Sequence, residues 1–175
     1  MIRAICSRVQ EREGYLNKTK LIKYLYLIDV EYYRVYKELF TGFNWIFKDF
    51  GPWAFEYNDI FEAMKRSPDF RIDEGNKPDL DTKFIRTKES LELGNVISDF
   101  DINLKVLRII DRWADETTAP MLNYVYFYTE PMVDGERGKS LDFTKIHHLE
   151  PIPKFELSKG SLSVKKLSEL KKEDS

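Results

Sequence analysis

Hydrophobic side chains recur every three or four residues along most of this chain, the spacing that gives an α-helix one apolar face. The pattern predicts helices over residues 2–13, 18–37, 55–65, 101–113 and 118–129. Residues 130–141 lack this periodicity and contain Pro131, Gly135 and Gly138, so we expect a loop there.

Several predicted helix ends carry residues suited to a boundary. Gly14 follows the first helix, at a place where a left-handed residue often ends a helix. Asn17 is suited to cap the second helix, and Asp99 or Asp101 the fourth. Pro120 falls in the first turn of the fifth helix, where proline is tolerated. These residues support the predicted boundaries.

The second helix is more apolar than a typical surface helix. Beyond one apolar stripe it carries hydrophobic residues on its other sides, namely Ile22, Tyr24, Tyr26, Leu27 and Val30. A helix that is apolar on several sides is packed on several sides. We therefore expect this helix to lie at the centre of the fold.

The β content is small. Residues 43–50 favour an extended segment, which ends at a Gly51-Pro52 bend before the next helix starts. Residues 70–72 and 84–87 predict a hairpin with turn residues at 73–79, and its strands could pair with the segment around Trp45. The fold class we predict is mainly α: a single compact helical domain of about five or six helices with a small antiparallel β element.

The chain changes character after residue 146. Pro151 and Pro153 interrupt any helix, and residues 161–172 are rich in lysine with Val164, Leu167 and Leu170 at three-residue spacing. We expect a helical domain over residues 1–146 and a C-terminal extension over residues 147–175. That extension could dock on the domain, bind a partner or stay disordered.

Composition limits the classes of function. The 175 residues are 42% hydrophobic, and their net charge of −2 gives no overall attraction to nucleic acid, which is only weakly expected as a partner. No apolar run approaches the roughly 20 residues that cross a bilayer, and the first residues are too charged for a secretory leader. We expect a cytoplasmic protein with no membrane contact. Its single cysteine, Cys6, has the spacing of a buried structural thiol.

No catalytic or metal-binding signature is visible. The string from Gly135 to Ser140 ends in Gly-Lys-Ser, but a phosphate-binding loop needs a glycine where this chain has Val133. His147 and His148 are sequence neighbours and project to different sides, and no further metal ligands accompany them. We expect no enzyme activity, no cofactor and no metal.

A binding surface is easier to support. The chain holds 10 tyrosines, 12 phenylalanines and 3 tryptophans, and aromatic residues are enriched where proteins bind each other. One helix alone carries Tyr24, Tyr26, Tyr32, Tyr33 and Tyr36. These five cannot all point inward, so those left outside either face a partner or lie along the surface with their hydroxyls in water.

Three segments, in this order, resemble one known family. The run from Lys20 to Asp29 (KLIKYLYLID) is similar to the hallmark Lys-Leu-x-Lys-Leu-Leu-Tyr, and Phe50-Gly51-Pro52 to a Gly-Pro step that follows an extended aromatic stretch. The run Tyr126-Phe127-Tyr128-Thr129-Glu130-Pro131-Met132, with residues 137–143 behind it, is similar to the closing segment. The family is the Panacea domain, also described as SocA-like or phage-associated GepA-like, and the resemblance spans residues 15–143.

The resemblance implies a function and a set of signature residues. Panacea domains are antitoxins encoded beside varied toxins, so it implies a bacterial or prophage protein that binds a cognate toxin and neutralises it or passes it to degradation. It implies no catalytic centre. The signature residues, which we expect to border the partner site, are Lys20, Lys23, Tyr26, Gly51, Pro52, Thr129, Glu130 and Pro131. We expect Glu130 to pair with a cation such as Lys20 or Lys23.

Two other functions stay open at this stage. The chain could be a DNA-binding transcriptional regulator that contacts phosphates through Lys18, Lys20 and Lys23 or through the lysine-rich extension. It could also be a phage-associated protein of unknown activity, or an enzyme with a pocket between Gly51-Pro52 and Thr129-Glu130-Pro131, although no nucleophile, base or metal set can be named. A homodimer is compatible with all of these functions.

Overall fold

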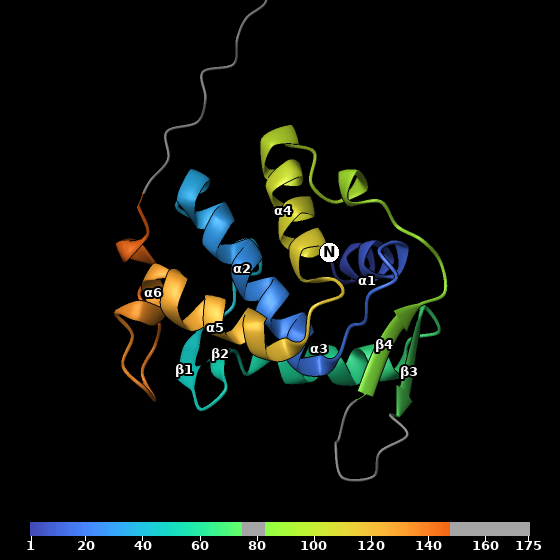
Figure 1. The fold of residues 1–175 in the computed structure, drawn as a ribbon, viewed down its shortest axis with the longest axis horizontal. Helices are drawn as coiled ribbons and strands as arrows, with labels where there is room; N and C mark the ends of the chain where they lie inside the picture. Colours follow the sequence, from blue (N-terminus) through green and yellow to red (C-terminus); the bar gives the residue numbers. More distant parts are fainter. Residues whose placement is uncertain (75–82, 148–175) are drawn as a thin grey trace, which may run out of the picture.

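The computed structural model describes residues 1–74 and 83–147 of the chain. Its α-helices, labelled in Figure 1, are α1 (Ile2–Glu11), α2 (Lys18–Tyr36), α3 (Glu56–Arg66), α4 (Phe100–Trp113), α5 (Thr118–Tyr128) and α6 (Glu130–Val133). Its strands are β1 (Ile46–Lys48), β2 (Gly51–Trp53), β3 (Phe70–Glu74) and β4 (Lys83–Thr87), and 3-10 turns cover Leu93–Asn95 and Phe143–Lys145. The predicted mainly α class is confirmed.

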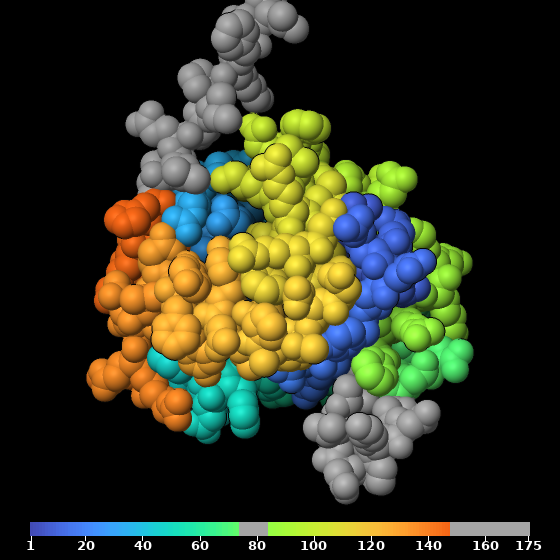
Figure 2. Space-filling model, viewed as in Figure 1, coloured from blue at the N-terminus to red at the C-terminus, as the bar shows by residue number. Residues whose placement is uncertain are grey.

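α2 is the central helix. Asn17 Oδ1 accepts a hydrogen bond of 2.7 Å from the backbone N–H of Lys20, so the predicted cap is confirmed. Every residue from 20 to 30 is buried. Figure 1 shows α4 and α5 lying along α2, and in the space-filling view of Figure 2 these two helices cover much of it. The prediction of a helix packed on several sides is therefore confirmed.

β1 and β2 form an antiparallel hairpin in which Phe47 pairs with Pro52. The prediction of an extended stretch that bends at Gly51-Pro52 into a helix was wrong: the bend lies at Asp49 and Phe50, and both predicted bend residues belong to β2. Proline lacks an N–H donor, which a strand on the edge of a two-stranded sheet can tolerate. Helix α3 therefore starts only after a further connection, at residue 56.

The segment that contains Gly-Lys-Ser lies along the other edge of β1. The Gly138 N–H donates to Phe47 O at 2.7 Å, the Phe47 N–H donates to Lys139 O at 2.9 Å, and the Leu141 N–H donates to Trp45 O at 2.9 Å. The backbone is therefore paired as in a sheet, and no helix follows Ser140 directly. This arrangement is not a phosphate-binding loop.

β3 and β4 form the predicted antiparallel hairpin, with Phe70 opposite Thr87. They do not pair with the Trp45 segment; within the described residues the two hairpins are separate sheets, so that prediction was wrong. The second hairpin is instead attached to α1, because the Gln10 side chain accepts from the Thr87 N–H at 2.7 Å. The predicted turn at 73–79 lies mostly outside the described residues.

The end of α1 differs from the prediction in one detail. The left-handed residue is Glu13, with φ of 56°, and Gly14 has ordinary dihedrals. A Cβ atom on Gly14 would lie 2.2 Å from Ala114 O, so glycine is needed there for close contact between two backbone segments. Cys6 is buried as predicted, and burial raises the pKa of its thiol to about 12.

The predicted loop over residues 130–141 begins with a short helix, α6. Thr129 ends α5 and also stands directly before α6, with extended dihedrals of −116° and 125°. Pro131 occupies the first turn of α6, where its missing N–H is no loss. Glu130 therefore starts a helix, whereas the sequence placed it at a helix end.

The C-terminal limit of the predicted domain, residue 146, lies next to the last described residue, His147. His148 and the proposed extension over 148–175 lie outside the described residues. Along the part of the chain that is described, none of the helices has the length and apolar character needed to cross a bilayer.

Asp99 is the cap of α4, which decides between the two predicted candidates. Its Oδ1 accepts from the Ile102 N–H at 3.0 Å, and its Oδ2 accepts from the Tyr36 hydroxyl at 2.6 Å. The second bond joins the start of α4 to the end of α2. Asp99 thus stabilises the start of α4 and also the contact between α4 and α2.

We expect Asp99→Ala to lower the free energy of unfolding by about 1–2 kcal/mol, since a cap and a bond between helices are both lost. Asp101→Ala is the matched control in the same helical turn, and it should cost about 0.5 kcal/mol or less. Urea denaturation followed by circular dichroism measures both. Equal losses for the two variants would contradict the assignment of the cap.

Candidate functional site

α2 carries four buried polar side chains at three-residue spacing: Lys20, Lys23, Tyr26 and Asp29. Each residue of a helix is rotated by about 100° from the one before it, so the side chains of residues three apart differ in direction by about 60°. The four groups therefore point to different neighbours. Three of them are predicted signature residues, and each binds a separate element of the fold.

Lys20 joins α2 to the connection after α4. Its Nζ donates to Tyr15 O at 3.1 Å, to Ala114 O at 2.9 Å and to Glu116 O at 2.8 Å. The ammonium also lies 4.0 Å from the centre of the Tyr15 ring. Burial lowers the pKa of Lys20 to about 8, and the carboxylates of Asp115 and Glu116 partly oppose the shift.

Lys23 joins α2 to β2. Its Nζ donates to Pro52 O at 2.8 Å, and burial lowers its pKa to about 7. Gly51 has a φ of 89°, a conformation that other residues rarely adopt, and a Cβ atom there would lie 3.4 Å from Lys23 Nζ. The lysine and the glycine-proline step, far apart in sequence, thus form one contact.

Tyr26 joins α2 to the junction of α5 and α6. Its hydroxyl is 2.9 Å from Thr129 Oγ1, which donates in turn to Val125 O at 2.6 Å. The Tyr26 ring packs edge-on against Trp45 at 5.4 Å between centroids. Burial raises the pKa of Tyr26, so the phenol stays protonated.

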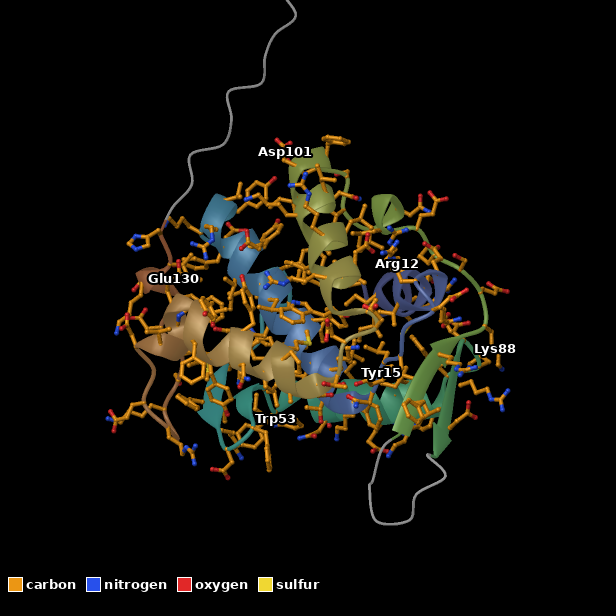
Figure 3. All side chains as sticks on the ribbon, in the orientation of Figure 1. Arg12, Tyr15, Trp53, Lys88, Asp101 and Glu130 are labelled. Carbon is orange, nitrogen blue, oxygen red and sulfur yellow. The ribbon has the colours of Figure 1, made fainter. Side chains whose placement is uncertain are left out.

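Glu130 does not pair with Lys20 or Lys23, as the sequence suggested, but with Arg34 near the end of α2. The two side chains form a bidentate pair, with N to O distances of 2.6 and 2.9 Å. Burial by itself raises the pKa of Glu130, but the hydrogen bonds and charge of Arg34 outweigh this and lower it. Figure 3 labels Glu130 beside α6, away from the N-terminal end of α2 that holds both lysines.

Asp29 joins α2 to the segment before β1. Its carboxylate accepts from the Thr41 N–H at 2.8 Å, from the Thr41 hydroxyl and from the Trp45 indole N–H at 2.7 Å. Burial raises the pKa of Asp29, and these donors partly oppose the shift. Asp29 thus holds the segment that leads into β1.

The predicted signature residues are therefore the contacts by which α2 holds its neighbours. Glu130 is half-buried and the other seven are buried: Lys20, Lys23, Tyr26, Gly51, Pro52, Thr129 and Pro131. A buried side chain offers almost no surface to a partner. Their arrangement accounts for a structural signature, and most of the surface that a partner covers has to come from other residues.

Comparison with known proteins identifies the family. The model of the family described as "Antitoxin SocA-like, Panacea domain" matches residues 21–120, more than half of the chain. This chain belongs to that family. The match runs from the first turn of α2 into α5, and it confirms the predicted family. No curated protein and no solved structure gave a match to this chain.

Most tyrosines of α2 in this Panacea domain are not exposed. Tyr24 and Tyr26 are fully buried, and only Tyr36 at the end of the helix counts as exposed. On α5, in contrast, Phe127 and Tyr128 are each 71% exposed. Helix α5 therefore presents more aromatic surface than α2, on which the sequence placed the aromatic binding face.

The aromatic residues of α5 continue onto the β1–β2 hairpin. Tyr126 lies 6.5 Å from Phe127 and 5.7 Å from Phe47 between ring centroids, and its hydroxyl donates to Asp49 O at 3.0 Å. On the next turn Tyr124 stacks on Tyr128 at 5.6 Å. We name the α5 members Tyr124, Phe127 and Tyr128 the α5 aromatic face. The sequence signal was the run Tyr124-Val125-Tyr126-Phe127-Tyr128, which is too aromatic for a helix that buries one side.

Other chemistry finds little support among residues 1–74 and 83–147. They contain no group of three or more His, Cys, Asp or Glu side chains that could hold a metal ion. The buried ionisable groups Lys20, Lys23 and Asp29 are bonded to separate elements and do not converge on one cleft. These buried contacts hold the β1–β2 hairpin and α5 in position on α2.

We expect Gly51→Ala to lower the free energy of unfolding by about 1–2 kcal/mol, because a residue with a side chain is strained at this positive φ. Gly94→Ala is the control: its φ is not positive and its nearest neighbour would be 3.7 Å away, so little should change. Thermal denaturation compares the two. Identical stability of Gly51→Ala and wild type would contradict the observed hairpin geometry.

Lys23 should make stability depend on pH. The unfolded chain binds a proton on Lys23 below the ordinary pKa of 10.5, whereas the folded protein binds it only below about 7. The contribution of Lys23 to stability therefore rises as pH increases from about 7 to 10.5. We expect the difference in unfolding free energy between wild type and Lys23→Met to rise by about 2–5 kcal/mol over this range. A flat difference would contradict this environment for the ammonium.

Proposed function

We propose that this Panacea-domain protein is an antitoxin: it binds a cognate toxin protein and neutralises it, without a reaction of its own. Membership of the antitoxin SocA-like family supports the protein partner. The observation that carries the proposal within this chain is the α5 aromatic face, in which Phe127 and Tyr128 present large aromatic rings to solvent.

The composition of this face suits a protein interface. Tyrosine, tryptophan and arginine are enriched at binding hot spots, and Arg112 lies 4.6 Å from the ring centres of both Trp113 and Tyr124. Stacked rings and a guanidinium held over them are already ordered before binding, so little entropy is lost when a partner covers them. We infer that Phe127 and Tyr128 insert into the toxin.

The alternative of a DNA-binding regulator loses most of its suggested contacts. Lys20 and Lys23 are buried and donate to backbone carbonyls, so neither projects from the surface towards the phosphates of a DNA duplex. Lys18 is half-buried and lies 4.8 Å from the centre of the Phe61 ring. The lysine-rich extension is outside the described residues. No observation favours this function over toxin binding.

The test is co-expression with the product of the adjacent reading frame, since antitoxins of this family are expected beside their toxins. Wild-type protein should relieve the growth defect that this product causes and should co-purify with it. Phe127→Asp and Tyr128→Asp should each weaken binding about 30-fold, because a hot-spot residue contributes about 2 kcal/mol. Titration calorimetry of the purified proteins measures the loss.

Phe100→Asp is the matched control. Phe100 is 77% exposed and stands at the first residue of α4, about 20 Å along that helix from Trp113 and the α5 aromatic face. It should bind the toxin as wild type does. A neighbouring product that is harmless alone and never co-purifies would overturn the proposed function, and equal losses for Phe100→Asp and Phe127→Asp would overturn the proposed face.

A further inference from the structure

A small cavity opens where the tip of the β1–β2 hairpin meets the N-terminal half of α2. Its volume of about 170 Å³ is several times the ~30 Å³ that a water molecule occupies in the liquid, so it has room for a small side chain. Ile22, Phe50 and Trp53 form its apolar walls. Trp53, labelled in Figure 3, lies at the edge of the molecule below α5, so the cavity is reached from the surface.

Lys23 lines this cavity together with Gly51, which lies directly against its Nζ. The ammonium has three N–H donors, but among the described residues its one acceptor is Pro52 O. Lys20 is the internal comparison, because its three donors meet three carbonyls. Lys20 is thus satisfied by the fold alone, whereas Lys23 has donors left for another acceptor.

The charges at the rim do not supply that acceptor. Asp49 lines the cavity, but its carboxylate already pairs with Arg137 at 3.1 Å. Lys48, also at the rim, places its Nζ 4.7 Å from the centre of the exposed Phe55 ring and forms no ion pair within the described part of the chain. The cavity therefore combines apolar walls with two lysine side chains that have no anionic partner among the described residues.

We propose that this cavity binds an acidic side chain of the toxin, whose carboxylate reaches Lys23. The carbon stem of that side chain packs against Phe50 and Trp53, and Lys48 attracts the charge from the rim. A carboxylate fits because hydrogen bonds between charged groups are the strong ones, and because a buried ammonium with unused donors is costly. This inference rests on the proposed function, since it names what the toxin inserts beside the hairpin.

The first experiment needs no toxin. Butyrate reproduces the stem and carboxylate of a glutamate side chain, and butyramide is its neutral counterpart. In an NMR titration of the isotopically labelled protein, butyrate should shift the Gly51 amide and Trp53 indole signals at tenfold or more lower concentration than butyramide. Lys23→Met should remove this preference. Equal responses to the two probes, or none to either, would overturn the proposal.

The second experiment uses the toxin and leaves the core intact. Lys48→Glu reverses a rim charge and Thr19→Trp blocks the opening at an exposed position; each should weaken toxin binding at least tenfold. Lys48→Arg and Thr19→Ser are the controls and should bind as wild type. If Lys48→Glu and Thr19→Trp also bind as wild type, the cavity is not the contact while the antitoxin function stands. If even wild type fails to bind the toxin, the proposed function and this inference both fall.

Discussion

The fold depends on burying one helix that carries hydrogen-bonding side chains on several sides. A buried donor or acceptor without a partner costs about 1–3 kcal/mol, so each polar side chain of α2 requires a group from a neighbouring element at a defined position. Lys20 takes the connection after α4, Tyr26 the junction of α5 and α6, and Asp29 the segment before β1. The apolar residues of α2 drive its burial, and the polar ones determine which neighbour lies where.

Local signals in the sequence predicted the helices well, and pairings across the chain poorly. Asn17 and Asp99 cap their helices because a cap needs only its own first turn. Glu130 and Arg34 lie 96 residues apart, and no local pattern records that the end of α2 approaches the start of α6. The short helix α6 was missed because Thr129 ends α5 and also stands directly before α6. In the sequence, Thr129 followed by Glu130-Pro131 looks like the end of a helix alone.

The sequence identified the signature residues but not how far each of them is exposed to solvent. Seven of the eight signature residues are buried because a pattern such as Lys-Leu-x-Lys reports the contacts that make the fold. Which aromatic side chains remain exposed depends on how many neighbours a helix has. α2 is covered even at Tyr24 and Tyr26, whereas α5 lies on the outside and leaves Phe127 in solvent. A surface that sits on such a fixed scaffold can differ between relatives while the scaffold remains the same.

The two buried lysines differ in how many of their donors the fold itself satisfies. An apolar residue in place of Lys20 would remove a donor from each of three carbonyls, of which only Ala114 O keeps another, the Tyr15 N–H, so the fold itself requires that ammonium. An apolar residue in place of Lys23 would remove the donor of Pro52 O alone, and it would avoid the cost of burying a charge. Stability alone therefore gives little reason for a lysine at position 23. An incoming carboxylate supplies that reason, and because it would bind Lys23 next to Gly51, it would also stabilise the hairpin on α2 and hold Phe50 beside the bound toxin.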